Sequence, residues 1–169
     1  MKNRKQQNKP ATSFRMTRQR MIMIGVLAAV ISGVGLFSYK SMIPVNGTAP
    51  VFGVPNNHFI KATHSSNSGY HWLSVSSGSV KGMRTSGGGG NMMNPEYTFN
   101  NGELETIHVI NEDYTTHSDH NFNIDEFNVH TKDLGYYESQ TMTFLADKTG
   151  TFQYYCSIHP EMKGEITVG

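Results

Sequence analysis

The sequence of 169 residues contains a single cysteine, Cys156, and has no aspartate or glutamate before Glu96. One cysteine excludes a disulfide framework, a zinc site built on two or more cysteines and a binuclear copper site held by two thiolates. Long apolar runs are equally scarce, since the sequence has only one, at residues 21–39. A protein with several membrane-spanning helices is therefore excluded.

The two kinds of charge are separated along the chain. Seven of the 14 basic residues lie within residues 1–20, and all 13 acidic residues lie at Glu96 or beyond. Residues 41–169 hold 6 basic and 13 acidic residues, a net charge of −7. Because nucleic-acid binding depends on neutralising phosphates with Lys and Arg, this sign argues against such a role for the folded part.

The uncharged run at residues 21–39 predicts a transmembrane helix. A helix needs about 20 residues to cross a bilayer, and this run is close to that length. The basic flank at residues 1–20 predicts a cytoplasmic N-terminus, with everything after Lys40 outside, in the periplasm or extracellular space. No small-x-small cleavage site follows the run, which favours an uncleaved, single-pass signal anchor in the cytoplasmic membrane over a cleaved signal peptide.

A linker is expected between the anchor and the domain. Residues 40–57 contain three prolines and no periodic apolar pattern, which is typical of an extended segment. Asn46 begins an Asn-Gly-Thr glycosylation sequon whose occupancy the sequence leaves open.

Residues 58–169 are predicted to form an all-β domain. Short segments of alternating polarity recur between Gly, Asn and Asp residues, which favours a β-sandwich or barrel. The expected strands are residues 58–63, 70–75, 97–99, 105–111, 121–124, 141–145, 151–156 and 165–168. The glycine run within residues 86–91 is interpreted as a loop, because no Gly-Lys-Ser/Thr follows it.

A cluster of metal-ligating residue types lies near the C-terminus. Cys156, His159 and Met162 follow one another with the spacing Cys-x2-His-x2-Met. A thiolate, an imidazole and a thioether are soft or borderline ligands, which together favour copper over magnesium, calcium or manganese. A loop this short between two strands can turn three side chains towards one point, with Pro160 stiffening it and Gly164 allowing the exit.

A fourth ligand must come from elsewhere, and His120 is the best of the eight histidines. His120, Phe122 and Ile124 alternate on one strand face, so a buried Phe122 and Ile124 would aim His120 inward. The other histidines lack such support: His117 has the wrong parity, His108 is expected to face outward, His64 and His71 are expected to be solvated, and His58 and His130 have no supporting pattern.

These motifs resemble the cupredoxin family, the type 1 (blue) copper proteins, over residues 93–169. The matching segments are Asn-Pro-Glu-Tyr-Thr-Phe at 94–99, Val-Ile-Asn-Glu-Asp at 109–113, His-Asn-Phe at 120–122 and the ligand loop. That loop looks like the one in amicyanin, whereas plastocyanins usually have two more residues before the methionine.

The resemblance implies a Greek-key β-sandwich holding one type 1 copper ion. Its ligands carry over as His120, Cys156, His159 and an axial Met162. Asn121 matches the asparagine that often follows the first ligand in the family, and Ser157 stands where a hydroxyl residue is often hydrogen-bonded near the site. Residues 58–93 are longer than a minimal cupredoxin needs, so they are candidates for covering or reshaping the site.

The function that follows is single-electron transfer between redox proteins, with no enzymatic activity, because four protein ligands leave no position for a substrate. In the family the edge of the histidine at His159 is the electron port, ringed by apolar residues such as Ile158 and Pro160. The acidic charge predicts a partner with a basic docking face. Two alternatives stay open: an open-site, nitrosocyanin-like copper enzyme acting on a small molecule, and a copper storage or delivery module.

Overall fold

The computed structural model describes residues 17–75 and 93–169. The chain divides into two compact units, Met1–Tyr39 and Lys40–Gly169. Most of the basic N-terminal segment and the glycine run at 86–91 lie outside the described residues.

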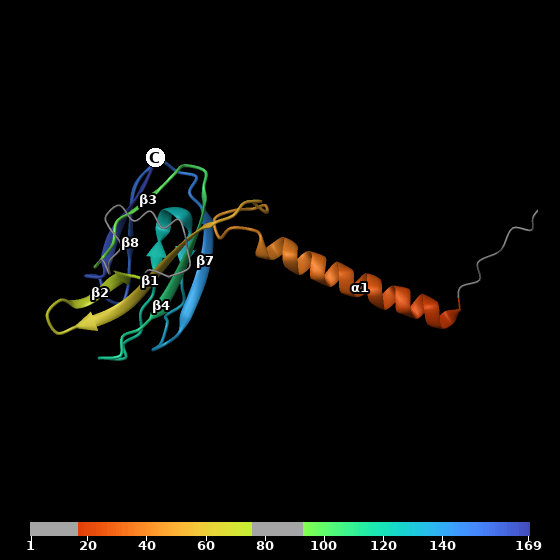
Figure 1. Ribbon diagram of the computed structural model, residues 1–169, viewed down its shortest axis with the longest axis horizontal. Helices are drawn as coiled ribbons and strands as arrows, with labels where there is room; N and C mark the ends of the chain where they lie inside the picture. The colour runs from red at the N-terminus through yellow and green to blue at the C-terminus, as the bar shows by residue number, and fades with distance from the viewer. Residues whose placement is uncertain (1–16, 76–92) are drawn as a thin grey trace, which may run out of the picture. The chain divides into compact units, whose positions relative to one another are not determined.

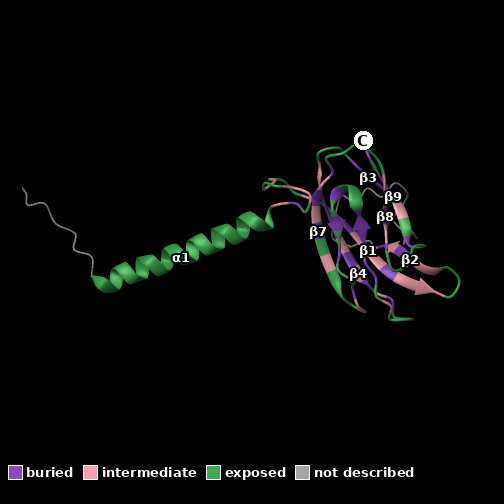
Figure 2. Cartoon of the chain, turned by 180° about the vertical axis from the view of Figure 1, so that it is seen from behind, coloured by how far each residue is buried: buried purple, intermediate pink, exposed green. Residues whose placement is uncertain are grey.

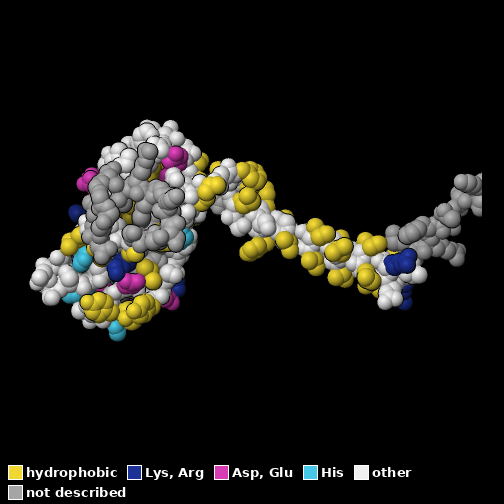
Figure 3. Space-filling view, viewed as in Figure 1, with side chains coloured by type: hydrophobic (Ala, Val, Ile, Leu, Met, Phe, Trp, Pro, Cys, Tyr) yellow, Lys and Arg dark blue, Asp and Glu magenta, His cyan; other side chains and the backbone are white. Residues whose placement is uncertain are grey.

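One helix, α1, spans Arg18–Ser41, and all but its last two residues belong to the first unit (Figure 1). It extends the expected span of 21–39 by three residues at its start and two at its end. None of its 24 residues is buried, and hydrophobic side chains cover its length (Figures 2 and 3). The helix is long and apolar enough to cross a membrane. The predicted spanning segment is thus helical, while its orientation across the membrane stays a prediction.

The second unit is a sandwich of two β-sheets (Figure 1). One sheet has the order β2-β1-β4-β7 and the other β3-β9-β8-β5-β6. Parallel pairing joins β1 to β4 and β3 to β9, and the other neighbours are antiparallel. The strands are β1 Asn56–Ser65, β2 Gly69–Ser74, β3 Tyr97–Phe99, β4 Leu104–Asn111, β5 Asn123–Ile124, β6 Val129–His130, β7 Ser139–Leu145, β8 Gly150–Tyr155 and β9 Lys163–Val168.

The prediction of an all-β sandwich is confirmed, and each expected strand has a counterpart. The sequence pattern missed β6 and the single 3-10 turn η1, Asp125–Phe127, that precedes it. Both elements are too short to show an alternating pattern, which needs about four residues.

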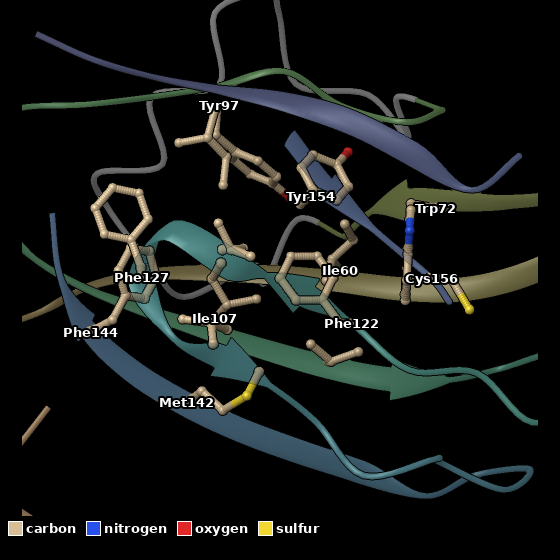
Figure 4. Close-up of a cluster of buried hydrophobic side chains, with 14 of the residues drawn as sticks. Ile60, Trp72, Tyr97, Ile107, Phe122, Phe127, Met142, Phe144, Tyr154 and Cys156 are labelled. Atoms are coloured by element: carbon tan, nitrogen blue, oxygen red, sulfur yellow. The ribbon is translucent and has the colours of Figure 1, made fainter. Parts of the chain in front are cut away.

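The core lies between the two sheets, and alternate residues of strands such as β1 and β7 are buried in it. In β1 the buried positions are His58, Ile60 and Ala62. At one end of the core the Phe122 ring lies edge-on to Trp72, with centroids 5.3 Å apart, and stacks on Tyr154 at 5.2 Å. Figure 4 shows these rings with Cys156 at the end of the cluster. Since aromatic side chains have few rotatable bonds and fill large volumes, they form a stiff wall behind that cysteine.

The segment expected to be a linker contacts the sandwich instead of running free. The Val45 amide donates to the Thr143 carbonyl oxygen at 2.8 Å. The Asn46 side chain pairs with Leu145 in both directions, donating from Nδ2 to its carbonyl oxygen at 2.7 Å and accepting from its amide at 2.9 Å. These contacts cover the outer edge of β7 and satisfy backbone groups that an open edge strand would expose. A glycan on Asn46 Nδ2 would compete with this pairing.

We expect Asn46→Ala to lower the free energy of unfolding by about 1–2 kcal/mol, because the partly buried amide and carbonyl of Leu145 lose their partners. Urea unfolding of the full chain in detergent measures the change. Asn46→Asp keeps the acceptor for the Leu145 amide but turns a carboxylate oxygen towards the Leu145 carbonyl oxygen and towards Asp147, so it is expected to destabilise the edge as well. Unchanged stability of the alanine variant would show that the edge pairing contributes nothing.

Candidate metal centre

Three of the four predicted ligands converge at one point. The ligand atoms of His120, Cys156 and His159 all lie within 4.8 Å of one another. Cys156 follows the last residue of β8, His159 lies in the loop between β8 and β9, and His120 lies just before β5. His120 thus meets Cys156, 36 positions further along the chain, because β5 pairs with β8 in the same sheet.

The loop that carries Cys156 and His159 is closed by its own backbone. The Cys156 amide donates to the Met162 carbonyl oxygen at 3.0 Å, and the Met162 amide donates to that of His159 at 2.9 Å. The same Met162 oxygen accepts a hydrogen bond from Trp72 Nε1 at 3.1 Å. Met162 is fully buried, so its thioether lies in the protein interior. The axial role of Met162 stays a prediction.

The position of His120 is fixed by backbone hydrogen bonds to Leu134. Its amide and carbonyl form a two-way bridge with Leu134, at 3.1 and 2.8 Å. The Asn111 side chain holds the same region by donating to the carbonyl oxygens of Leu134 and Ser118, both at 2.8 Å. His120, Phe122 and Ile124 are all fully buried, so the alternation that selected His120 gave its true orientation.

Asn121 ties the His120 segment to the cysteine loop. Its Oδ1 accepts from the Ser157 amide at 2.8 Å, and its Nδ2 donates to Ser157 Oγ at 2.7 Å. Asn123 Nδ2 donates to the same Asn121 oxygen at 2.8 Å. The hydrogen bonds expected of Asn121 and Ser157 are therefore present, and they connect the two chain segments that carry the converging side chains.

The imidazoles at this point have nitrogens suited to a metal. Nδ1 of His120 and Nδ1 of His159 are buried and have no hydrogen-bond partner among the described residues. Nε2 of His120 is also buried and faces only Asp113 Oδ2, at 3.5 Å. Burial lowers the pKa of His120, and the nearby His159 lowers it further, although Asp113 opposes the shift. Burial also lowers the pKa of His159. Neutral imidazole is the metal-ligating form, and a buried nitrogen without a partner is costly unless it is coordinated.

The donor set therefore fits a soft or borderline metal ion. Two imidazoles and one thiolate are the trigonal ligands of a blue copper site, completed by a weak axial methionine. His120 and Cys156 would hold the ion from the interior, and His159 would hold it from the partly exposed side.

Sequence reasoning missed an aromatic cover over His159. The Tyr70 ring lies on His159 with ring centroids 3.9 Å apart, and the His64 ring lies 4.7 Å from that of Tyr70. The Tyr70 hydroxyl is hydrogen-bonded to Ser118 Oγ at 3.0 Å and donates to Thr116 Oγ1 at 3.1 Å. Part of the extended segment 58–93 thus contacts the site, as its length suggested.

Three histidines differ from the expectation that they are solvated or unsupported. His71 is 6 % exposed and bonds the Gly69 carbonyl oxygen, and His64 is only partly exposed. His58 is also 6 % exposed, and its Nε2 lies 2.7 Å from the buried Glu105 Oε2. The alternation His58, Ile60, Ala62, His64 in β1 was the signal that would have placed two of them inward.

Comparison with known proteins agrees with this geometry. Residues 93–168 match the family model of the cupredoxin-like domain. The match covers a little less than half of the chain. Among solved structures, rusticyanin variants align with a TM-score of 0.50 and 16% identity, over 70% of this chain and 80% of theirs. No curated protein matches the sequence.

Other solved structures that align with the chain include an auracyanin and a multicopper oxidase. Auracyanin from Roseiflexus castenholzii aligns with a TM-score of 0.42 and 19% identity, over 69% of this chain and 99% of that one. The multicopper oxidase mgLAC aligns with a TM-score of 0.44 and 15% identity, over 68% of this chain. The chain spans only 39% of the length of that oxidase. At such identities the likeness extends to the fold alone.

Proposed function

We propose that the protein is a membrane-anchored carrier of single electrons that uses one type 1 copper ion outside the cytoplasmic membrane. The observation that carries this proposal is the convergence of the His120, Cys156 and His159 ligand atoms within 4.8 Å in a cupredoxin-like domain. Copper, when bound there, supplies a one-electron couple between Cu(I) and Cu(II).

The surrounding residues favour a site whose shape changes little with oxidation state. Hydrogen bonds close the loop from Cys156 to Met162, and the Asn121–Ser157 contacts join that loop to the His120 segment. The buried ring of Trp72 donates to the same loop. A donor set held in this way needs little reorganisation when an electron arrives or leaves, because its groups already have fixed positions.

Burial of the ligands supports a carrier over an open-site enzyme. His120, Cys156 and Met162 are fully buried, and only His159 is partly exposed. With Met162 as the axial ligand, all coordination positions belong to the protein and none is left for a substrate. Electrons would then enter and leave at the His159 side, where Ile158 and Pro160 are exposed.

The charge of the domain supports a basic docking face on the redox partner. Residues 96–169 contain 3 lysines and 13 acidic residues, a net charge of −10. Such a field steers an oppositely charged partner at long range, so the association rate would fall as salt is added. The helix α1 would keep the carrier at the membrane surface, with the domain on the side opposite the basic N-terminus.

The test is visible absorption of the full chain, purified in detergent and loaded with one equivalent of Cu(II). We expect an intense thiolate-to-copper charge-transfer band that does not change when azide is added, and copper that a chelator removes slowly. A band that shifts with azide would favour the open-site enzyme. Rapid loss of copper to the chelator would favour a storage or delivery module, and absence of a thiolate band would overturn the proposal altogether.

A further inference from the structure

A buried carboxylate lies directly behind His120. Asp113 follows the end of β4 by two residues, and its side chain is fully buried. Its Oδ2 lies 3.5 Å from His120 Nε2, the ring nitrogen on that side. This acid belongs to none of the ligand positions discussed above, and burying it without a role would be costly.

The Asp113 carboxylate is held in place by hydrogen-bond donors from the residues that follow it. Oδ1 accepts from the amides of Thr115 and Thr116, at 3.2 and 3.1 Å. Oδ2 accepts from the Thr116 hydroxyl and from the Ser118 amide, the latter at 3.3 Å. Four N–H and O–H donors directed at two oxygens stabilise the ionised form of a carboxyl group. The backbone and side chains of residues 115–118 thus stabilise a negative charge on Asp113.

The Asn111 side chain helps to position both Asp113 and His120. Asn111 Oδ1 accepts from the Asp113 amide at 2.9 Å, and Asn111 Nδ2 holds the Leu134 carbonyl oxygen, which itself accepts from the His120 amide. Asp113 and His120 are therefore set in register by one asparagine. The Tyr70 hydroxyl extends the network by donating to Thr116, the residue that donates to Asp113.

From this arrangement we infer that Asp113 is a positioning residue for His120 and that its charge favours the oxidised state of the bound metal. The carboxylate keeps the ring proton on Nε2, which leaves Nδ1 free for the metal, as carboxylates commonly do for ligating histidines. The Cu(II)–thiolate centre carries one more positive charge than its Cu(I) form. A buried negative charge therefore stabilises the oxidised form relative to the reduced one. The second half of this inference rests on the proposed function.

The first experiment compares Asp113→Asn with Asp119→Asn by redox titration of the copper-loaded full chain. Asp119 is the matched control, because it is an acid one residue before His120 whose side chain is exposed. At a fixed ambient potential we expect the ratio of reduced to oxidised protein to rise about tenfold for Asp113→Asn, a positive shift of about 59 mV for one electron. The control is expected to change the ratio less than about twofold, because water screens an exposed charge. Equal shifts, or a negative shift for Asp113→Asn, would overturn the inference.

The second experiment needs neither copper nor a variant. Nitrogen-15 NMR of the metal-free wild-type chain identifies which ring nitrogen of His120 carries the proton. A proton on Nε2 supports the positioning role, and a proton on Nδ1 overturns it. Because this measurement is independent of the thiolate band, failure of the proposed function and failure of the positioning role are distinguished.

Discussion

Cys156→Ser is expected to abolish the visible charge-transfer band of the copper-loaded protein. That band needs a thiolate bound to copper, and Cys156 is the only cysteine in the chain. Serine offers a hard oxygen that stays protonated, so copper retention should also fall by a factor of ten or more. Absorption spectroscopy and competition with a chelator measure the two effects.

The control for this substitution is Ser157→Ala, one residue further along the same loop. It removes a hydroxyl that bonds Asn121 but leaves the thiolate and the Ser157 amide contact in place. We expect the band to persist with a modest shift. A band of full intensity in Cys156→Ser would mean that copper is bound elsewhere, and circular dichroism establishes whether each variant is folded.

Gly164→Ala is expected to cause the largest loss of stability, about 3 kcal/mol or more. A Cβ at this position would lie 2.3 Å from Tyr154 Oη and 2.4 Å from its Cζ. The ring cannot move aside easily, because it is fully buried, stacks on Phe122 and donates to the Pro95 carbonyl oxygen at 2.6 Å. Gly164 pairs with Tyr154 across β8 and β9, so the strain falls next to the ligand loop.

Urea unfolding of the full chain measures this loss, and Gly135→Ala is its control. A Cβ at Gly135 would meet its nearest neighbour, Asp119 Oδ1, at 3.7 Å, which is an ordinary contact. That variant should unfold within about 0.5 kcal/mol of the wild type. If Gly164→Ala were as stable as the wild type, Tyr154 would have to be mobile. The interpretation that a stiff aromatic wall lies behind Cys156 would then be wrong.

The ligand loop was predictable because its information is local. Cys156, His159 and Met162 lie within seven residues, and the spacing alone limits where their side chains can go. His120 was predictable for a different reason, since strand alternation coupled its orientation to Phe122 and Ile124. Both inferences use distances along the chain or the two-residue period of a strand. The same alternation was available for His58 and His64 in β1 and was not applied to them.

The groups around the ligands could not be inferred in this way. Tyr70 reaches His159, and Asp113 reaches His120, only because the β1–β2 hairpin and the end of β4 come to the same end of the sandwich. The parallel pairing of β1 with β4 joins segments almost 50 residues apart, and no short-range pattern reports such a pairing. The docking of Asn46 on β7 is likewise a contact between residues 99 positions apart.

By itself, then, the sequence determined the long apolar helix, the all-β class and the residue types that suit copper, because each depends on composition, period or spacing within a few residues. The tertiary structure alone decided which carboxylate lies behind His120, which ring covers His159 and which edge the proline-containing segment protects. These depend on how distant strands pair, and that pairing is set by the packing of the whole core rather than by any one segment.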